Sequence, residues 1–283
     1  GTLNHIVETT GEPTPQAAAE TEADTLKRIA TDYELVGNTS AAVKYHQRRV
    51  GLNKSEASYW YDYGMFCYRT GDAAKGDECL EEVLSLVNCG HTQALLALGC
   101  RAFGQNEEKS RTFLEECVQK DPSNALATAA LTIVLHESGA DVPQPSSSSS
   151  SSSPSPITPE TYDSLATFLL DIRATAFAER LLSTAILEYG GRWEFIINTA
   201  RLNTFSGRLR WAEDNAQRAL DLSFTSPRVW SLFGHIYSLQ NNWEEAITSY
   251  KKAVELYQES GMKETNEELI KVLLKLGHSW FKM

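Results

Sequence analysis

The sequence has 283 residues, 42% of them hydrophobic, and a formal net charge of −11. This length allows one elongated domain or two compact ones, and the acidic balance argues against a broad nucleic-acid-binding surface. No stretch has the roughly 18 to 20 apolar residues of a membrane span, and no signal-peptide pattern opens the chain. We therefore expect an intracellular, soluble protein without membrane contact.

The N-terminal part of the chain is its most acidic part. Residues 1–141 contain 21 acidic and 12 basic residues, so a basic or apolar partner suits this half better than an acidic one. The chain begins with Gly1 rather than Met, which indicates an excised tag or an internal fragment. We expect residues 1–22 to be a flexible extension.

A small residue recurs along the chain from residue 23 onward, at intervals of 34, 35, 33, 34, 34, 34 and 43 residues. A large apolar residue usually lies four positions before it. Side chains three and four apart share a helix face, so the large residues form a ridge and the small one admits a neighbouring helix. The pattern predicts repeated pairs of antiparallel helices. The small positions are Ala30, Gly64, Gly99, Thr132, Ala166, Ala200, Gly234 and Gly277.

Helix boundaries agree with this period. Thr158 and Ser226 each precede a proline, the combination of an N-cap residue and a proline at the first helical position. Gly71 stands where a left-handed turn must end a helix. The predicted helix pairs therefore have sequence-encoded ends.

The fourth pair lacks its second helix. Between His136 and Thr158 the sequence contains eight consecutive serines flanked by prolines, a composition that cannot bury enough apolar surface to order itself. We interpret this stretch as a linker. Either the helix array continues across it, or the array splits there into two lobes.

The last interval of 43 residues predicts a longer second helix, a turn near Gly261 and one final helix, which is either a cap or the start of a truncated repeat. The expected organisation is therefore an extension (1–22), a first array (23–139), a Ser/Pro-rich linker (140–158), a second array (159–260) and a terminal helix (261–283).

A period of 34 residues with these helix-pair columns resembles the tetratricopeptide repeat (TPR) family. The resemblance implies an all-α fold, a right-handed superhelix of antiparallel helix pairs with one Ser/Pro-rich interruption. It further implies an inner face, made mostly by the first helix of each pair, that holds a peptide or a partner protein. The repeats of this family supply no catalytic activity of their own.

No motif indicates an enzyme. The six histidines are scattered, no H-E-x-x-H or C-x-x-C pattern occurs, and neither a phosphate-binding nor a dinucleotide-binding glycine loop is present. We expect no catalytic residues, no cofactor and no metal site.

A partner-binding groove is expected on the inner face, from the first-helix residues that lie off the packing ridge. In the second to fourth repeats these form an apolar and aromatic strip, and such strips commonly bind partners. Two alternatives remain: a narrow groove whose side chains touch one another, or a groove filled by the segment before Ala23. The expected binding residues are Tyr61, Met65, Tyr68, Arg69, Leu96, Phe103 and Ile133.

A chaperone-binding clamp is not expected. The resemblance would require Lys and Asn on successive first helices; Lys27 could fill one position, but Thr31 and Met65 stand where asparagines belong. The clamp is therefore absent as a set.

Two segments, "AAVKYHQRRVGLN" and "YWYDYGMFCYRTGDAAKGDECLEEVLSL", resemble the carboxy-terminal TPR region of axonemal, cilia- and flagella-associated proteins. The resemblance implies a structural or docking subunit of the axoneme, with axonemal proteins as partners and a location in the cytoplasm, cilium or flagellum. The alternatives are a regulatory or adaptor domain of a larger enzyme or chaperone complex, and an RNA-binding repeat, which would need a basic groove. The oligomeric state stays open.

Overall fold

The computed structural model describes residues 21–139, 157–261 and 266–283, which form fourteen α-helices and no strand. Residues 1–20 and 140–156, which carry nearly all of the expected extension and Ser/Pro-rich linker, lie outside the described residues. None of the described helices is long and apolar enough to cross a membrane. The fold is all-α, as the periodicity predicts.

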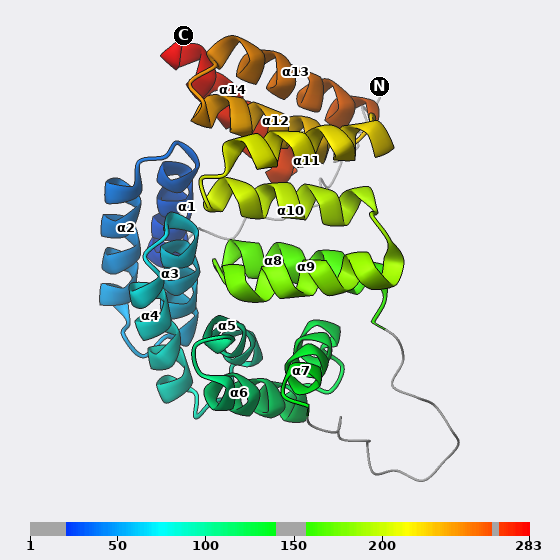
Figure 1. The fold of residues 1–283 in the computed structure, drawn as a ribbon. Coiled ribbons are helices and arrows are strands. Elements are labelled where there is room, and N and C mark those ends of the chain that lie inside the picture. The colour runs from blue at the N-terminus through cyan, green and yellow to red at the C-terminus, as the bar shows by residue number, and fades with distance from the viewer. Residues whose placement is uncertain (1–20, 140–156, 262–265) are drawn as a thin grey trace, which may run out of the picture.

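The described part of the first half contains three helix pairs and one single helix (Figure 1). In each pair the second helix packs antiparallel on the first. The helices are α1 (Glu22–Leu35), α2 (Thr39–Leu52), α3 (Ala57–Thr70), α4 (Ala73–Leu86), α5 (Thr92–Ala102), α6 (Glu107–Lys120) and α7 (Ala125–Glu137).

The second half repeats the arrangement after the interruption. Three further pairs follow, and a single helix ends the chain. These helices are α8 (Pro159–Asp171), α9 (Thr175–Tyr189), α10 (Trp193–Phe205), α11 (Leu209–Leu222), α12 (Pro227–Leu239), α13 (Trp243–Glu259) and α14 (Glu267–Lys282).

The small residues of the repeat do allow close helix contact. A Cβ atom on Gly64 would lie 3.1 Å from Cys79 Cβ, and one on Gly234 would lie 2.6 Å from the ring of Tyr250. A Cβ atom would be tightly packed at Gly64 and would overlap the neighbouring ring at Gly234. The ridge-and-groove assignment made from the sequence is confirmed there.

Two positions of the small-residue column are not fully buried. Both lie on first helices that have no described second helix of the same repeat. Thr132 on α7 is half-buried. Gly277 on α14 is exposed, and a Cβ atom added to it would have nothing within 4 Å. Each lies on a first helix that no described second helix covers. The burial of this column therefore depends on the second helix of the same pair.

The helix ends are those that the sequence predicts. Thr158 caps α8 by accepting a hydrogen bond from the Thr161 backbone N–H at 3.3 Å, and proline follows it. Ser226 and Pro227 begin α12 in the same way, although the Ser226 side chain makes no capping bond. Gly71 ends α3 with φ of +94°, in the left-handed region that favours glycine.

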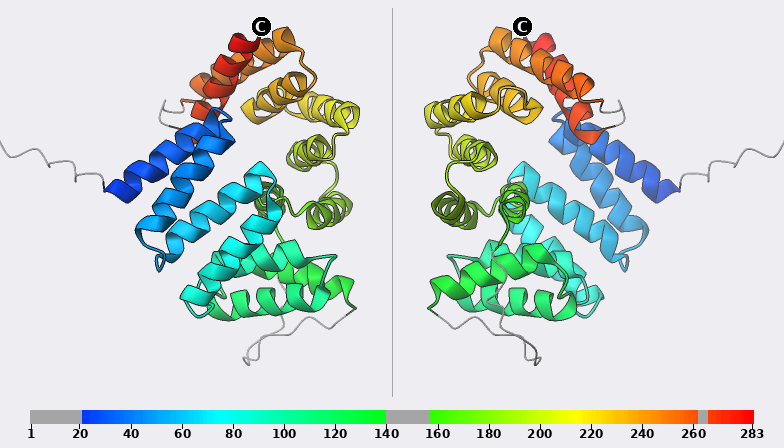
Figure 2. Two further views of the ribbon diagram at one scale, coloured as in Figure 1. Left: turned by 90° about the vertical axis from the view of Figure 1, so that its left-hand side faces the viewer. Right: turned by 90° about the vertical axis from the view of Figure 1, so that its right-hand side faces the viewer.

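The two halves share one core across the interruption. Helix α7 packs directly on α8, and one hydrophobic cluster extends from Ala57 to Leu202. Helices α5 to α7 form the bend at one end of the molecule, and α1–α4 and α8–α12 extend from it as two arms that touch where α3 contacts α8 (Figures 1 and 2). Of the two arrangements left open by the sequence, the described helices form the continuous one.

Candidate functional site

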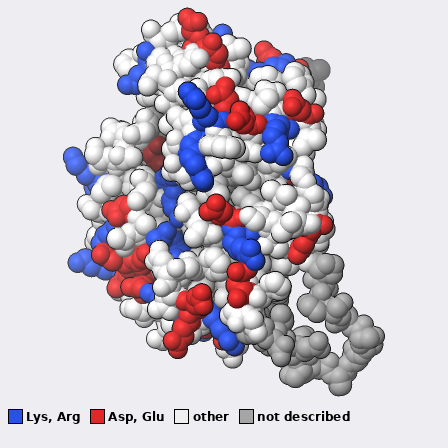
Figure 3. Space-filling model, in the orientation of Figure 1, with Lys and Arg blue, Asp and Glu red and all other residues white. Residues whose placement is uncertain are grey.

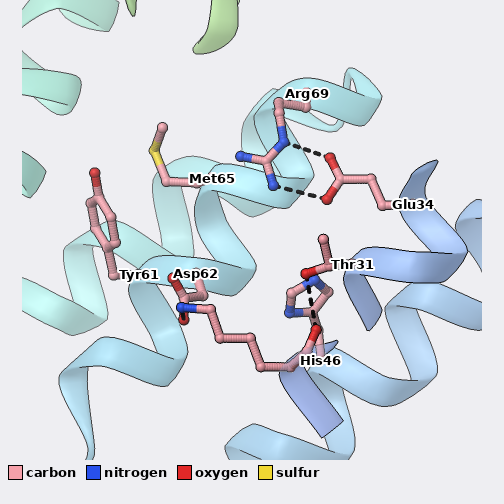
Figure 4. A pocket seen from close by; sticks show the side chains of 8 residues that line it. Thr31, Glu34, His46, Tyr61, Asp62, Met65 and Arg69 are labelled. Carbon is pink, nitrogen blue, oxygen red and sulfur yellow. Dashed lines mark hydrogen bonds and ion pairs between the residues drawn. The ribbon is translucent and has the colours of Figure 1, made fainter. Parts of the chain in front are cut away.

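A pocket of about 220 Å³ opens on the inner face of the first two repeats, between α1 and α3 (Figure 4). Its wall consists of three side chains from α1, four from α3 and one from α2. The lining residues are Lys27, Thr31, Glu34, His46, Tyr61, Asp62, Met65 and Arg69. We call this the inner pocket.

Helical spacing explains why these residues meet. Lys27, Thr31 and Glu34 lie four and three residues apart, so they share one face of α1. Tyr61, Met65 and Arg69 lie four residues apart on α3. Because the packing ridges of α1 and α3 turn toward their second helices, these two stripes line the space between the first helices.

Asp62 is the electrostatic centre of the inner pocket. Its Oδ2 accepts from Lys27 Nζ at 2.8 Å and from Arg49 Nη1 at 2.6 Å. Partial burial alone would raise the pKa of Asp62, but the hydrogen bonds and charges of Lys27 and Arg49 outweigh it and lower the pKa. The carboxylate is therefore ionised and forms ion pairs with one basic side chain from α1 and one from α2.

A second ion pair links α1 and α3 across the pocket. Arg69 binds Glu34 through one edge of its guanidinium group: Nε donates to Oε1 at 2.5 Å and Nη2 donates to Oε2 at 2.9 Å (Figure 4). Burial opposes the charge on Arg69, yet Glu34 raises its pKa overall. Such two-point pairs fix geometry as well as charge, so the two first helices are held at a set separation.

The remaining wall is apolar. Tyr61 and Met65 lie at the left of Figure 4, on the same stripe of α3 as Arg69 and across the pocket from Thr31 and His46. The Tyr61 ring packs on His91 at 4.7 Å between centroids, and burial raises the pKa of Tyr61 to about 12. The phenol is thus neutral at any physiological pH.

His46 lies behind Thr31 and was missed as a pocket residue by the sequence pattern. It is buried against the rings of Tyr63 and Phe66, at 5.7 and 4.7 Å, and neither ring nitrogen has a hydrogen-bond partner among the described residues. Burial lowers its pKa to about 4. The sequence did not indicate His46 as a pocket residue, because it lies on a second helix and the groove was expected to be lined by first helices.

The inner pocket combines one apolar wall with a charged wall whose two carboxylates are already paired. Its two cations and two anions suit a side chain or backbone segment of another polypeptide, with apolar contact on one side and hydrogen bonding on the other. Within the described residues, no group of three or more His, Cys, Asp or Glu side chains is placed to hold a metal ion.

The structure brings three of the seven expected groove residues together: Tyr61, Met65 and Arg69 line the inner pocket. Tyr68 does not join them. Its ring is fully buried against Gly76, and its hydroxyl donates to Asp77 at 2.7 Å. The expectation that Tyr68 faces the groove is wrong, because Gly76 on α4 leaves space for the Tyr68 ring between α3 and α4.

Leu96, Phe103 and Ile133 also do not line an open groove. Leu96 and Ile133 are buried in the cluster that contains α8 and α9 residues, and Phe103 stacks on Phe177 at 4.4 Å. The α8–α9 pair covers this part of the inner face because α8, rather than a second helix of the fourth repeat, packs on α7. The expected open strip is therefore reduced to its N-terminal end.

A hydrogen-bonded contact secures this arrangement. Arg173, between α8 and α9, accepts at its carbonyl from Arg101 Nη1 at 3.2 Å and donates from Nη2 to the Arg69 carbonyl at 3.1 Å. Its guanidinium also lies 3.8 Å from the centre of the Phe205 ring. The second array thus contacts α3 and α5 beside the inner pocket. On the face shown in Figure 3, basic side chains are interspersed with acidic ones along this junction.

Comparison with known proteins identifies two family models. Residues 26–152 match the cilia and flagella-associated protein 70 middle TPR-like domain, and residues 227–260 match a tetratricopeptide repeat. The sequence suggested the carboxy-terminal TPR region of such proteins, whereas the matching model describes the middle one.

Individual relatives agree over part of the chain. Human cilia- and flagella-associated protein 70 is 30% identical over 127 residues, 44% of this chain and 11% of the relative. The protein of that name from Macaca fascicularis is 34% identical over 79 residues, 28% of this chain and 8% of the relative. The matches thus span about a tenth of the relatives' length. A TPR protein of known structure from Parabacteroides merdae is 17% identical, with 92% of this chain and 85% of the other covered and a TM-score of 0.42.

Proposed function

Because the chain belongs to the tetratricopeptide-repeat family, we propose that it is a non-catalytic scaffold that docks neighbouring proteins in the ciliary or flagellar axoneme. The observation that supports docking is the inner pocket, where α1 and α3 present an apolar wall beside fixed charges. Axonemal docking is favoured by the similarity of residues 26–152 to the middle TPR-like domain of a cilia- and flagella-associated protein.

Preorganisation is the proposed mechanism. The Arg69–Glu34 and Lys27–Asp62 pairs hold α1 and α3 in place before a partner arrives. A partner segment then loses its own conformational freedom but does not have to reshape the pocket. Tyr61 and Met65 supply the apolar contact, and Lys27 and Arg69 supply hydrogen-bond donors at its edge.

Co-sedimentation with salt-washed ciliary axonemes tests this proposal. We expect the wild-type protein to pellet with axonemes and the Tyr61→Ala/Met65→Ala variant to bind about tenfold more weakly, because central apolar contacts carry much of a binding free energy. The matched control is Leu187→Ala/Trp211→Ala, which removes two exposed apolar side chains from other helices.

Circular dichroism melting shows whether each variant is folded before its binding is compared. Equal axoneme binding by the wild type and a folded pocket variant would exclude the inner pocket as the docking site. Failure of the wild type to bind axonemes at all would exclude the axonemal role.

A further inference from the structure

A second pocket, of about 410 Å³, lies on the outer face of the seventh repeat. It opens between the second helices α11 and α13, whereas the inner pocket opens between first helices. Helix α12 forms its floor. Its lining includes Leu220 from α11, Trp230, Phe233 and Tyr237 from α12, and Glu244 and Glu245 from α13. We call this the outer pocket.

Its floor is aromatic. Phe233 stacks on Tyr237 at 5.9 Å and contacts Trp230 at 6.2 Å between ring centres. Trp230 also meets Phe224 edge to face at 5.5 Å, and Phe224 is 60% exposed. The apolar surface therefore continues from the pocket out to the molecular surface, where it is in contact with water.

The ring positions are fixed rather than mobile. Trp230 Nε1 donates to the Phe224 carbonyl at 2.9 Å, so the indole N–H is satisfied. The indole ring itself lines the pocket. Tyr250 packs against Gly234, which lies on the same face of α12 as Trp230 and Tyr237, so α12 is held closely against α13. A binding partner would meet a preformed surface.

The rim of the outer pocket is acidic. Glu244 and Glu245 lie in the first turn of α13, and Glu213 lies across from them beside Tyr237. None of the three has an ion-pair partner among the described residues, although Glu213 accepts a hydrogen bond from Gln240 at 3.1 Å. The first turn of a helix stabilises acidic side chains, but it leaves their outer oxygens available to a cation.

We propose that the outer pocket docks a segment of a partner protein in which a large apolar side chain is followed by Lys or Arg. The apolar side chain packs on Trp230, Phe233 and Tyr237, and the cation pairs with Glu244 and Glu245. This occupant follows from charge complementarity, since the three rim carboxylates beside an apolar floor disfavour an acidic or purely apolar segment. With the inner pocket, the scaffold would then bind two partners on opposite faces.

The test uses fluorescein-labelled peptides of twelve residues and the full chain. One peptide carries a central Phe followed by two Lys, a second has Glu in place of Lys, and a third has Ser in place of Phe. Fluorescence polarisation should show the first binding most tightly and weakening as salt is raised, because exposed charges are screened.

Thr248→Arg blocks the pocket with little risk to folding. Thr248 is exposed on α13, lines the pocket, and its hydroxyl donates to the Glu244 carbonyl at 3.0 Å. The new cation would occupy Glu244 and Glu245 itself. Thr112→Arg is the matched control, because Thr112 is likewise exposed and donates to the Glu108 carbonyl at 2.8 Å on α6. Thr248→Arg should weaken the Phe-Lys-Lys peptide at least tenfold and Thr112→Arg less than twofold.

Further variants separate the contributions. Glu244→Gln/Glu245→Gln should weaken binding about fivefold and reduce its salt dependence, while Tyr61→Ala/Met65→Ala should leave it unchanged. Equal loss in Thr248→Arg and Thr112→Arg would mean non-specific attraction to an acidic protein and would overturn the proposal. So would equal binding of the three peptides, or concentration-dependent self-association that Thr248→Arg abolishes, since the occupant would then be a second copy of the chain.

Discussion

The second and seventh repeats occupy the same place in the register, yet they shape their outer surfaces differently. Trp60 and Trp230 are equivalent, and each indole donates to the carbonyl six residues earlier, at 2.8 and 2.9 Å. The helix frame of the two regions is therefore alike. What differs is the chemistry of the side chains that this frame presents.

One difference is a hydroxyl group that only the second repeat has. In the second repeat Gln47 Nε2 donates to the Tyr63 hydroxyl at 3.2 Å, which brings the Gln47 side chain across the outer face. The equivalent of Tyr63 is Phe233, which offers no acceptor. Gln217, the equivalent of Gln47, bonds instead to Asp221 on its own helix at 2.9 Å.

The rim charges differ as well. Lys75 in the second repeat pairs with Glu78 at 2.7 Å, so the rim there is balanced. The equivalent residues in the seventh repeat are Glu245 and Thr248, a carboxylate and a neutral hydroxyl. A TPR frame can thus present a closed neutral surface or an open acidic pocket without a change of fold.

The largest expected difference between the two regions concerns pH, because His46, which packs on Tyr63 and Phe66 of the second repeat, corresponds to Ala216. Burial lowers the pKa of His46 from 6.5 to about 4. Between these values the unfolded chain binds a proton that the folded chain does not, so stability falls as the pH drops from about 6.5 to about 4. The shift corresponds to about 3 kcal/mol.

His46→Phe should remove this loss, since a phenyl ring suits the contacts with Tyr63 and Phe66. Urea unfolding at several pH values measures the effect. His235, whose pKa burial lowers to about 3, titrates in both proteins and so cancels in the comparison. Parallel pH curves for the two proteins would contradict the assignment to His46.

A smaller difference is expected from alanine at the two equivalent glycines. Gly234→Ala should lower the free energy of unfolding by about 2 kcal/mol, because its Cβ would meet the buried Tyr250 ring at 2.6 Å. Gly64→Ala should cost less than about 1 kcal/mol, because its contacts begin at 3.1 Å and helix propensity offsets part of the cost.

Gly277→Ala provides the control for this pair of substitutions. A Cβ there meets nothing within 4 Å, so alanine should raise stability by about 1 kcal/mol through helix propensity alone. Equal effects at Gly64 and Gly234 in thermal or urea unfolding would show that the neighbouring side chains move aside at no cost.

The smallest effect is expected from exchanging the single hydroxyl. Tyr63→Phe should lower the free energy of unfolding by about 1 kcal/mol, the usual contribution of one hydrogen bond. Phe233→Tyr should offer Gln217 an acceptor and weaken the Phe-Lys-Lys peptide about threefold. Peptide binding that is unchanged in a Phe233→Tyr protein of normal stability would show that the hydroxyl does not control the outer pocket.

The sequence predicted the parts of the inner pocket that depend on helical spacing. Tyr61, Met65 and Arg69 were placed on the inner face, and these three line the pocket together with Lys27, Thr31 and Glu34, which share one face of α1 by the same spacing. His46 escaped because it reaches the pocket from a second helix. Tyr68 was misplaced because its ring, although off the ridge in the pattern, packs over Gly76.

The sequence by itself determined the helix pairs, their ends and the columns at which neighbouring helices touch, because these contacts join residues a few tens of positions apart and recur with the period. Only the tertiary structure decided that α8 and α9 cover Leu96, Phe103 and Ile133. That contact joins segments on either side of the interruption, and the repeat period does not tell how the helices after it pack on those before it. It also decided the side-chain contacts of the two outer surfaces, because Gln47 reaches the Tyr63 hydroxyl whereas Gln217 bonds within its own helix.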